Sequence, residues 1–315
     1  MALSQSAMGF DLGGGLIAGL GVAGTGFGVL VGTVSRAVSP EKRSQTVGLV
    51  SAAGSLGTLI LAPLGQVLIA DFGWRNALLV FVAVAAAMAF IAIAMGSRSS
   101  NPQAGTQETG STAEILRRAM SHRGYLAMSA AFFACGFQLM FITAYLPQYL
   151  VICGVSPGTS ATALGLIGLG NAVGSYVFGR LGGTFSQKRL LSFIYLSRTA
   201  TILVFLALPV TQASTLAFAA TMGFLWLGVV PLVSSLIGNL FGMRYFNTLF
   251  GLTFFSHQVG SFIGAWAGGL SFDLTGSFNT AWTALIVIGI SAAMLQWNMD
   301  DSKEPGSLVL HREVS

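Results

Sequence analysis

The chain has 315 residues, of which 54% are hydrophobic and only 8% are charged. Since a soluble domain carries about 25% charged residues, this composition excludes an ordinary soluble protein and indicates a polytopic membrane protein. The net charge of +5 does not indicate nucleic-acid binding, because the basic residues lie in short connections beside apolar segments, where membrane topology explains them. Contact with anionic lipid is a secondary interpretation of the same residues.

About nine apolar segments are long enough to cross the bilayer as helices, which takes about 20 residues each. All but two of the 15 Lys and Arg residues, Arg75 and Arg198, fall in or beside alternate connections or in the tail. Because positive charge stays on the cytoplasmic side, we expect an all-α protein of the cell inner (plasma) membrane, with Met1 outside and the C-terminus inside. The expected spans are residues 10–35, 44–70, 74–96, 124–152, 158–181, 190–210, 214–241, 245–271 and 278–298.

The first expected span is rich in glycine, from Gly13 to Gly32. Small residues let helix backbones approach closely in a membrane, and such packing explains the run. The run does not match a phosphate-binding loop, because apolar residues flank it and the terminal Lys-Ser or Lys-Thr is missing.

A polar segment at residues 97–123 divides the chain and predicts a cytoplasmic linker. Within it, Ser111 and Glu114 have the spacing of a capping box, which predicts a short amphipathic helix through Met120. A disordered linker is the alternative. The predicted organisation has four parts, which are a partial N-terminal half at 1–96, the linker at 97–123, a six-helix C-terminal half at 124–298 and a cytoplasmic tail at 299–315.

Residues 54–78 and 260–284 form a weak internal repeat, in which a Gly-Ser start and small residues along an apolar helix lead to an Asp and a Gly. Parallel repeats of this kind are typical of transporters built from two equivalent halves. Aligning Asp71 with Asp273 places the first-half mate of Gly124 about 80 residues before Met1, which is room for about three helices. We therefore expect the chain to correspond roughly to helices four to twelve of a twelve-helix protein.

Several short motifs resemble those of the major facilitator superfamily over the whole length of the chain. They are Ser39-Pro40-Glu41-Lys42-Arg43, Gly48, Gly54 and Gly57, Pro63-Leu64-Gly65, Gly73-Trp74-Arg75, and Gly179-Arg180-Leu181-Gly182 with Lys188-Arg189. The last of these resembles the family's loop between helices eight and nine, although Gly183 stands where that loop has an acidic residue. Within the family, Lys42-Arg43, Gly48, Ala52 and Gly57 resemble the fifth-helix motif of the monocarboxylate transporters.

The resemblance implies a secondary active transporter of a small solute that works by alternating access. A small organic anion, such as a monocarboxylate carried with a proton, is the first expectation. A neutral, sugar-like solute or a drug is the alternative within the family, although Ala62-Pro63 and Gly65-Gln66 disfavour drug export. A truncated, non-transporting remnant or a regulatory membrane partner is a further alternative. No enzyme, metal or cofactor is expected, because no catalytic set or Cys/His cluster converges.

His257 is the one histidine inside an expected span, on the helix that resembles the family's pathway-lining eleventh helix. An imidazole titrates near pH 6.5, which suits protonation coupled to the binding of an anion. Gln258 beside it is a further candidate. A neutral histidine hydrogen-bonded between helices is the alternative.

Arg198 is the one charge expected deep in the membrane, about 14 Å beyond Arg189 at 1.5 Å per helical residue. An arginine at the centre of a span costs about 2.5–3.5 kcal/mol, so we expect it to face protein or water and to have a partner. A carboxylate substrate is one such partner. Backbone carbonyls of neighbouring helices are the favoured alternative, because the family's ninth helix packs outside the cavity.

Four further residues are candidates for contact with the substrate. Gln138 and Tyr145 are seven residues apart and share a helix face. Pro147 can interrupt that helix and expose backbone groups. Asn171 and Trp226 are polar or amphipathic residues inside spans. Interface anchoring is the alternative for Tyr145.

Overall fold

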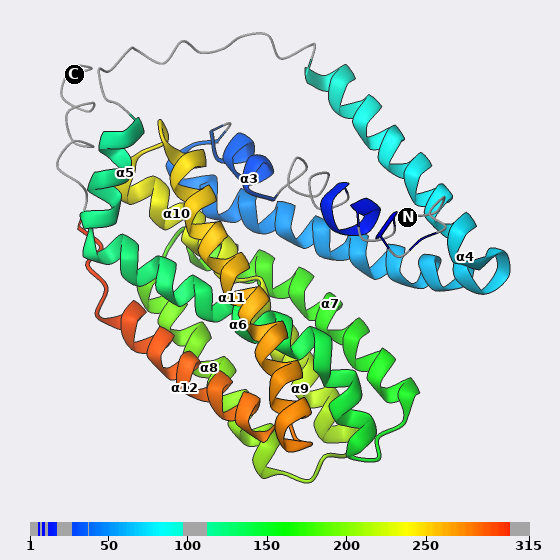
Figure 1. Cartoon of the computed structure of the whole chain (residues 1–315). Coiled ribbons are helices and arrows are strands. Elements are labelled where there is room, and N and C mark those ends of the chain that lie inside the picture. Colours follow the sequence, from blue (N-terminus) through cyan, green and yellow to red (C-terminus); the bar gives the residue numbers. More distant parts are fainter. Residues whose placement is uncertain are drawn as a thin grey trace, which may run out of the picture. The chain divides into compact units, whose positions relative to one another are not determined.

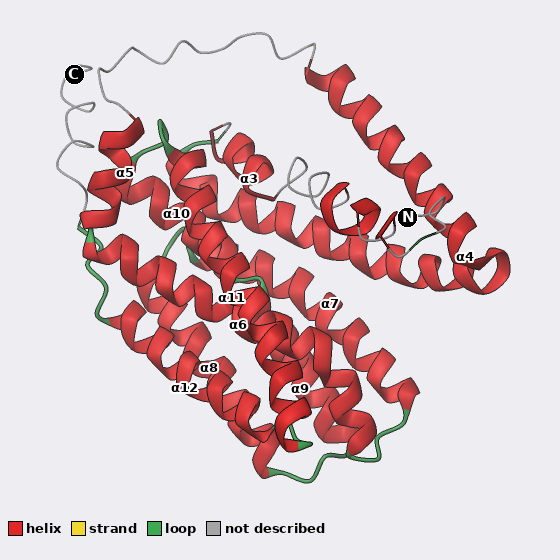
Figure 2. Ribbon diagram, in the orientation of Figure 1, coloured by secondary structure: helices red, strands yellow, loops and turns green. Residues whose placement is uncertain are grey.

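The computed structural model of the chain describes residues 6, 8–9, 12–17, 27–36, 38–96 and 112–302 (Figure 1). Apart from turns and connections, these residues are helical, and no strand occurs among them (Figure 2). The prediction of an all-α membrane protein is therefore confirmed. Much of the first expected span, most of the linker and the tail beyond residue 302 lie outside the described residues, as does Ser111.

The N-terminal region contributes three helical elements. A π-helix, η1 (Leu12–Ile17), and the helix α3 (Phe27–Arg36) fall within or next to the first expected span. The element α4 (Pro40–Gly96) contains the next two expected spans, which meet at Gly73. Gly73 has φ 76° and ψ 158°, a conformation that glycine adopts without steric cost. The predicted boundary between these two spans is confirmed.

The rest of the described chain forms eight helices. They are α5 (Thr112–Ser121), α6 (Arg123–Ile152), α7 (Pro157–Leu181), α8 (Gln187–Ala207), α9 (Gln212–Trp226), α10 (Val229–Phe241), α11 (Phe246–Thr275) and α12 (Asn279–Trp297). The short helix predicted in the linker is present as α5. By length and composition, 6 segments of the described residues can cross a membrane, and residues 212–241 count as one of them.

The span expected at residues 214–241 is present as one segment long and apolar enough to cross a membrane, but it consists of two helices, α9 and α10, rather than one continuous helix. Leu227 and Gly228 separate them inside the apolar segment. We call these two residues the helix break. A hydropathy average does not detect the break, because neither Leu227 nor Gly228 is polar or charged and the apolar segment continues through both residues.

Two pairs of helices in the C-terminal half approach so closely that only glycine fits between them. A methyl group on Gly260 or Gly264 of α11 would lie 2.1 or 2.4 Å from the carbonyl oxygens of Phe133 and Phe137 on α6. A methyl group on Gly174 of α7 would lie 1.8 Å from a carbonyl oxygen of α9. Close backbone contact of this kind is what holds helices together where no water surrounds them.

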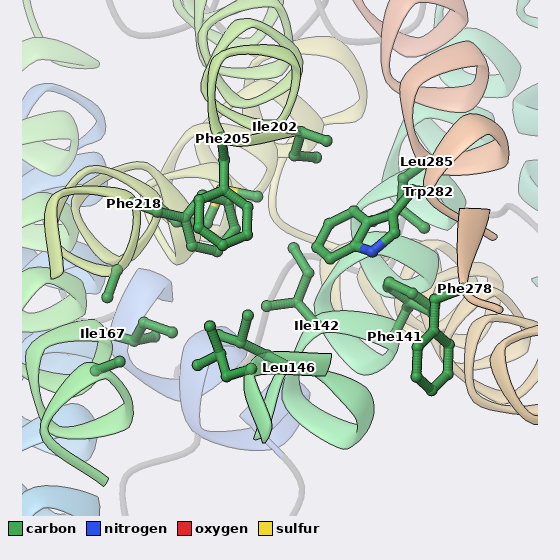
Figure 3. Close-up of a cluster of buried hydrophobic side chains, with 14 of the residues drawn as sticks. Phe141, Ile142, Leu146, Ile167, Ile202, Phe205, Phe218, Phe278, Trp282 and Leu285 are labelled. Atoms are coloured by element: carbon green, nitrogen blue, oxygen red, sulfur yellow. The ribbon is translucent and has the colours of Figure 1, made fainter. Parts of the chain in front are cut away.

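An aromatic cluster fills the space between α6, α8, α9 and α12 (Figure 3). The rings of Phe205 and Phe218 stack with centroids 4.3 Å apart, and Phe141 meets Trp282 edge to face at 5.0 Å. Such ring pairs contribute about 0.5–1.5 kcal/mol beyond the area that they bury. The cluster fixes the relative positions of the four helices that surround the polar groups described below.

The described chain forms two compact units, and the first turns of α4 belong with the C-terminal helices in the unit formed by 28–56 and 111–315. Gly48 of α4 faces Gly179 of α7, where a methyl group on Gly48 would lie 2.5 Å from the carbonyl oxygen of Ser175. Arg43, only 4% exposed, donates through Nε to the carbonyl of Ser35 at 3.4 Å. The division into halves at residues 96 and 124 stays a prediction.

Candidate functional site

Arg198 of α8 is the centre of a buried polar cluster in the C-terminal half. It is 2% exposed and donates through Nε to the carbonyl of Leu225 at 3.3 Å and through Nη2 to the carbonyl of Trp226. Leu225 and Trp226 are the last two residues of α9, so their carbonyls have no helical N–H partner. Arg198 therefore caps the C-terminus of α9, where the helix dipole also favours a positive charge.

Asn171 of α7 holds the other side of the helix break. Its side-chain oxygen Oδ1 accepts a hydrogen bond from the backbone N–H of Leu227 at 3.2 Å. Gly228 follows, and a methyl group there would lie 2.5 Å from the ring of Phe178. Side chains from α7 and α8 thus satisfy the backbone groups that the break exposes. Satisfied groups are what allow irregular backbone at membrane depth.

Gln138 of α6 lies beside the same cluster. It is 1% exposed, and its Nε2 donates to the carbonyl of Leu285 on α12 at 3.1 Å. Its Oε1 has no partner among the described residues. Gln138, Arg198 and Trp226 line one narrow internal void together with Leu139, Ile142 and Met222. The structure thus brings three of the predicted residues to one place, with Asn171 at the adjacent break.

His257 of α11 is only 8% exposed. Its Nδ1 is 3.1 Å from Oε1 of Gln258, an exposed side chain. Because an amide oxygen only accepts, Nδ1 is the donor. The imidazole ring packs on Phe132 at 4.7 Å and is parallel to Phe254 at 5.5 Å.

Cys135 joins His257 to the arginine cluster. Its Sγ accepts from Nη1 of Arg198 at 3.3 Å, and its thiol also interacts with His257. Sequence reasoning missed this residue, because a single cysteine in an apolar helix has the pattern of a packing residue. Its place three residues before Gln138, on the same helix face, was the available signal.

Tyr145 does not join this cluster. Its hydroxyl donates to the carbonyl of Ala265 on α11 at 2.7 Å, and its ring covers Gly268, where a methyl group would lie 2.3 Å from it. Tyr145 and Gln138 share a face of α6 as predicted, yet they bond to different helices. In the structure Tyr145 therefore ties α6 to α11.

The C-terminal helices carry very little negative charge. From residue 123 to residue 297 the sequence contains one acidic side chain, Asp273, which is exposed near the end of α11. The positive charge of Arg198 is therefore balanced by carbonyl and thiol dipoles within this part of the chain. Among the described residues no group of three or more His, Cys, Asp or Glu could hold a metal ion.

Comparison with known proteins agrees with this architecture. Residues 6–265 match the Major Facilitator Superfamily. The chain is 25% identical over 262 residues to the uncharacterized MFS-type transporter YcxA of Bacillus subtilis, covering 79% of this chain and 62% of YcxA. It is 26% identical over 277 residues to monocarboxylate transporter 12 of Rattus norvegicus, covering 76% and 56% of the two chains.

A third relative, monocarboxylate transporter 13 of Rattus norvegicus, is 27% identical over 272 residues, which cover 85% of this chain and 61% of the relative. The chain thus spans between about half and two thirds of the length of these curated relatives. The family match extends over most of the chain, through the helices that carry Arg198, Asn171 and His257. The chain belongs to the major facilitator superfamily of membrane transporters.

Proposed function

We propose that the protein carries a small organic anion, a monocarboxylate, across the plasma membrane together with a proton. The observation that carries the proposal is His257, a nearly buried imidazole beside the exposed Gln258, in a set of helices whose one acidic residue is Asp273. A proton-coupled anion carrier can use a positive charge that appears and disappears with a proton, whereas a proton-coupled carrier of cations generally uses a membrane carboxylate. Similarity to proteins named monocarboxylate transporters supports the same substrate class.

The proposed coupling follows from the charge of the imidazole. When His257 is protonated, it attracts a carboxylate, and a bound carboxylate in turn favours the protonated form. Anion and proton therefore bind cooperatively, and each raises the affinity for the other by the same factor. In this scheme Arg198 is a structural residue, because its donors are engaged by Leu225, Trp226 and Cys135.

The substrate site is proposed to open to the two sides of the membrane in turn, by alternating access. The contact of Gly48 with Gly179 supports this, because small residues let α4 and α7 close one end without interlocking side chains. The basic residues near that contact, Lys42, Arg180 and Arg189, favour a cytoplasmic position for it, with the C-terminus on the same side.

The proposal is tested by uptake into proteoliposomes that contain the protein expressed from its complete gene. Radiolabelled monocarboxylates, neutral sugars and lipophilic cations are compared with and without an inward proton gradient. We expect a monocarboxylate to accumulate and the gradient to increase its uptake. Sugar uptake that does not depend on the proton gradient would contradict this proposal and would indicate neutral-solute transport instead. Uptake of none of the three classes would contradict it altogether.

A further inference from the structure

A basic hollow lies where α5 meets α6, away from the cluster around Arg198. It is lined by Arg117, Arg118, Ser121, His122, Arg123 and Asp300. Figure 1 shows α5, the start of α6 and the segment after α12 together at one end of the C-terminal helices. The hollow is therefore built from two separate parts of the chain, the junction of α5 and α6 and the segment after α12.

Packing fixes the shape of this basic hollow. Nδ1 of His122 accepts from the backbone N–H of Tyr125 at 3.2 Å and so caps α6, while Nε2 lies 3.3 Å from the carbonyl oxygen of Ser302. The imidazole meets the ring of Phe241 edge to face at 5.5 Å. A methyl group on Gly124 would lie 1.8 Å from the carbonyl oxygen of Asp300, so the segment after α12 is held against α6.

Positive charge exceeds negative charge in the basic hollow. Arg118 forms an ion pair with Glu114 one turn earlier on α5. The carboxylate of Asp300 accepts from the hydroxyl and the N–H of Ser302 at 2.6 and 3.0 Å, and these bonds lower its pKa. The side chains of Arg117 and Arg123 are exposed and form no ion pair with the described residues. With the charges of Glu114 and Asp300 counted, the hollow keeps a net positive charge and two guanidinium groups that have no ion-pair partner within the described part of the chain, which favours an anionic ligand.

The basic hollow also lies at the start of a helix that can span the membrane, which is where a lipid headgroup is expected. Arg123 is the first residue of α6, which is long and apolar enough to span the membrane. Met120 follows Arg117 by three residues and is 52% exposed, and Leu126 follows Arg123 by three and is 39% exposed. Residues three apart share a helix face, so each arginine has an exposed apolar neighbour on its own face.

We propose that the basic hollow binds the phosphate of an anionic phospholipid, with an acyl chain against Met120 and Leu126. A guanidinium group donates two parallel hydrogen bonds to phosphate oxygens, which gives both affinity and a fixed orientation. Basic pockets beside spanning helices on the cytoplasmic side are suited to such headgroups. A free phosphate could bond to the arginines but has no acyl chain to contact Met120 and Leu126, so we expect it to bind far more weakly.

The test compares three forms of the protein in nanodiscs of phosphatidylcholine with and without phosphatidylglycerol. The first is the native chain, the second is Arg117→Gln/Arg123→Gln, and the third is the charge-matched control Arg180→Gln/Arg189→Gln. Arg180 and Arg189 are also exposed basic residues of the same predicted side. Native mass spectrometry counts the phosphatidylglycerol retained after extraction, and thermal melting checks that each variant is folded.

We expect the native chain and the control to retain phosphatidylglycerol in preference to phosphatidylcholine. The Arg117→Gln/Arg123→Gln variant should bind it about 25-fold more weakly, because each basic residue beside an anionic lipid contributes about a factor of five. Arg117→Lys/Arg123→Lys, which keeps the charge, should recover part of the affinity. Equal loss in the control would overturn the proposal, as would unchanged retention in the glutamine variant. Displacement of the lipid by inorganic phosphate at matched concentration would do so too.

Discussion

At the scale of single residues, the buried polar groups of the C-terminal helices serve two different purposes. Arg198 and Asn171 bond to backbone groups at the helix break, because Arg198 donates to the carbonyls of Leu225 and Trp226 and Asn171 accepts from the N–H of Leu227. His257 is only 8% exposed but has the exposed Gln258 beside it, and in the proposed scheme it is the residue that takes up the proton and attracts the anion.

We predict that Arg198→Ala destabilises the protein by about 2–5 kcal/mol, because the carbonyls of Leu225 and Trp226 lose their partner at membrane depth. Arg198→Lys should lose less, since one ammonium can reach one of the two carbonyls. Thermal melting in detergent measures the effect, and Arg189→Ala on the same helix is the exposed control. Normal melting with abolished anion binding would instead make Arg198 a substrate ligand.

We predict that His257→Gln preserves folding and flattens the pH dependence of monocarboxylate exchange measured at equal pH on both sides. In the proposed scheme the protonated ring of the native chain binds the anion, so exchange is fastest at low pH and falls as the pH rises. Glutamine keeps a hydrogen-bonding group and does not titrate. A variant with the native rate and pH profile would show that His257 only packs between α6 and α11.

At the scale of elements, the helices could be predicted from the sequence, but only one of the two interruptions described above could be. The reversal at Gly73 was predictable, because a glycine and a charged residue, Arg75, separate two apolar runs. The helix break was not, because Leu227 and Gly228 continue an apolar run and the groups that stabilise the break come from α7 and α8. Such tertiary contacts leave no pattern in the local sequence. For the same reason, the sequence could not show which backbone carbonyls bond to Arg198.

We predict that Gly264→Ala destabilises the α6–α11 pair by about 1–3 kcal/mol, because its methyl group would lie 2.4 Å from the carbonyl oxygen of Phe137. Gly251→Ala on the same helix, where nothing lies within 4 Å, should be neutral or slightly stabilising, since alanine favours helix. Thermal melting of the two variants separates close packing from helix propensity. Equal melting temperatures would contradict the close approach of α6 and α11.

At the scale of the whole molecule, the C-terminal helices form a closely packed frame that contains His257 and the cluster around Arg198. Glycine contacts join α6 to α11 and α7 to α9, and the aromatic cluster joins α6 to α8, α9 and α12. Sequence could identify this frame as a set of membrane helices and could place His257 within it. It could not show which candidates are already bonded to their neighbours, such as Tyr145 to Ala265, because those bonds depend on how the helices pack.

We predict that the connection before α9 is outside the cell and the connection before α8 is inside. Ala213, in the first turn of α9, and Thr184, in the connection before α8, are both exposed. The exposed Cys153 is first replaced by serine, which leaves the buried Cys135 as the native cysteine. In this background, a membrane-impermeant maleimide added to intact cells should label Ala213→Cys and should leave Thr184→Cys unlabelled until the cells are opened. The reverse pattern would invert the topology that the basic residues indicate.

Movement of protons driven by the substrate alone tests the proposed coupling most directly. Proteoliposomes that hold a trapped pH-sensitive dye, with no initial pH gradient, receive a monocarboxylate outside. We predict that the interior acidifies with the native chain, because each anion enters with a proton, and that His257→Gln largely abolishes the response. Uptake of the labelled anion without any change of internal pH would contradict proton-coupled transport.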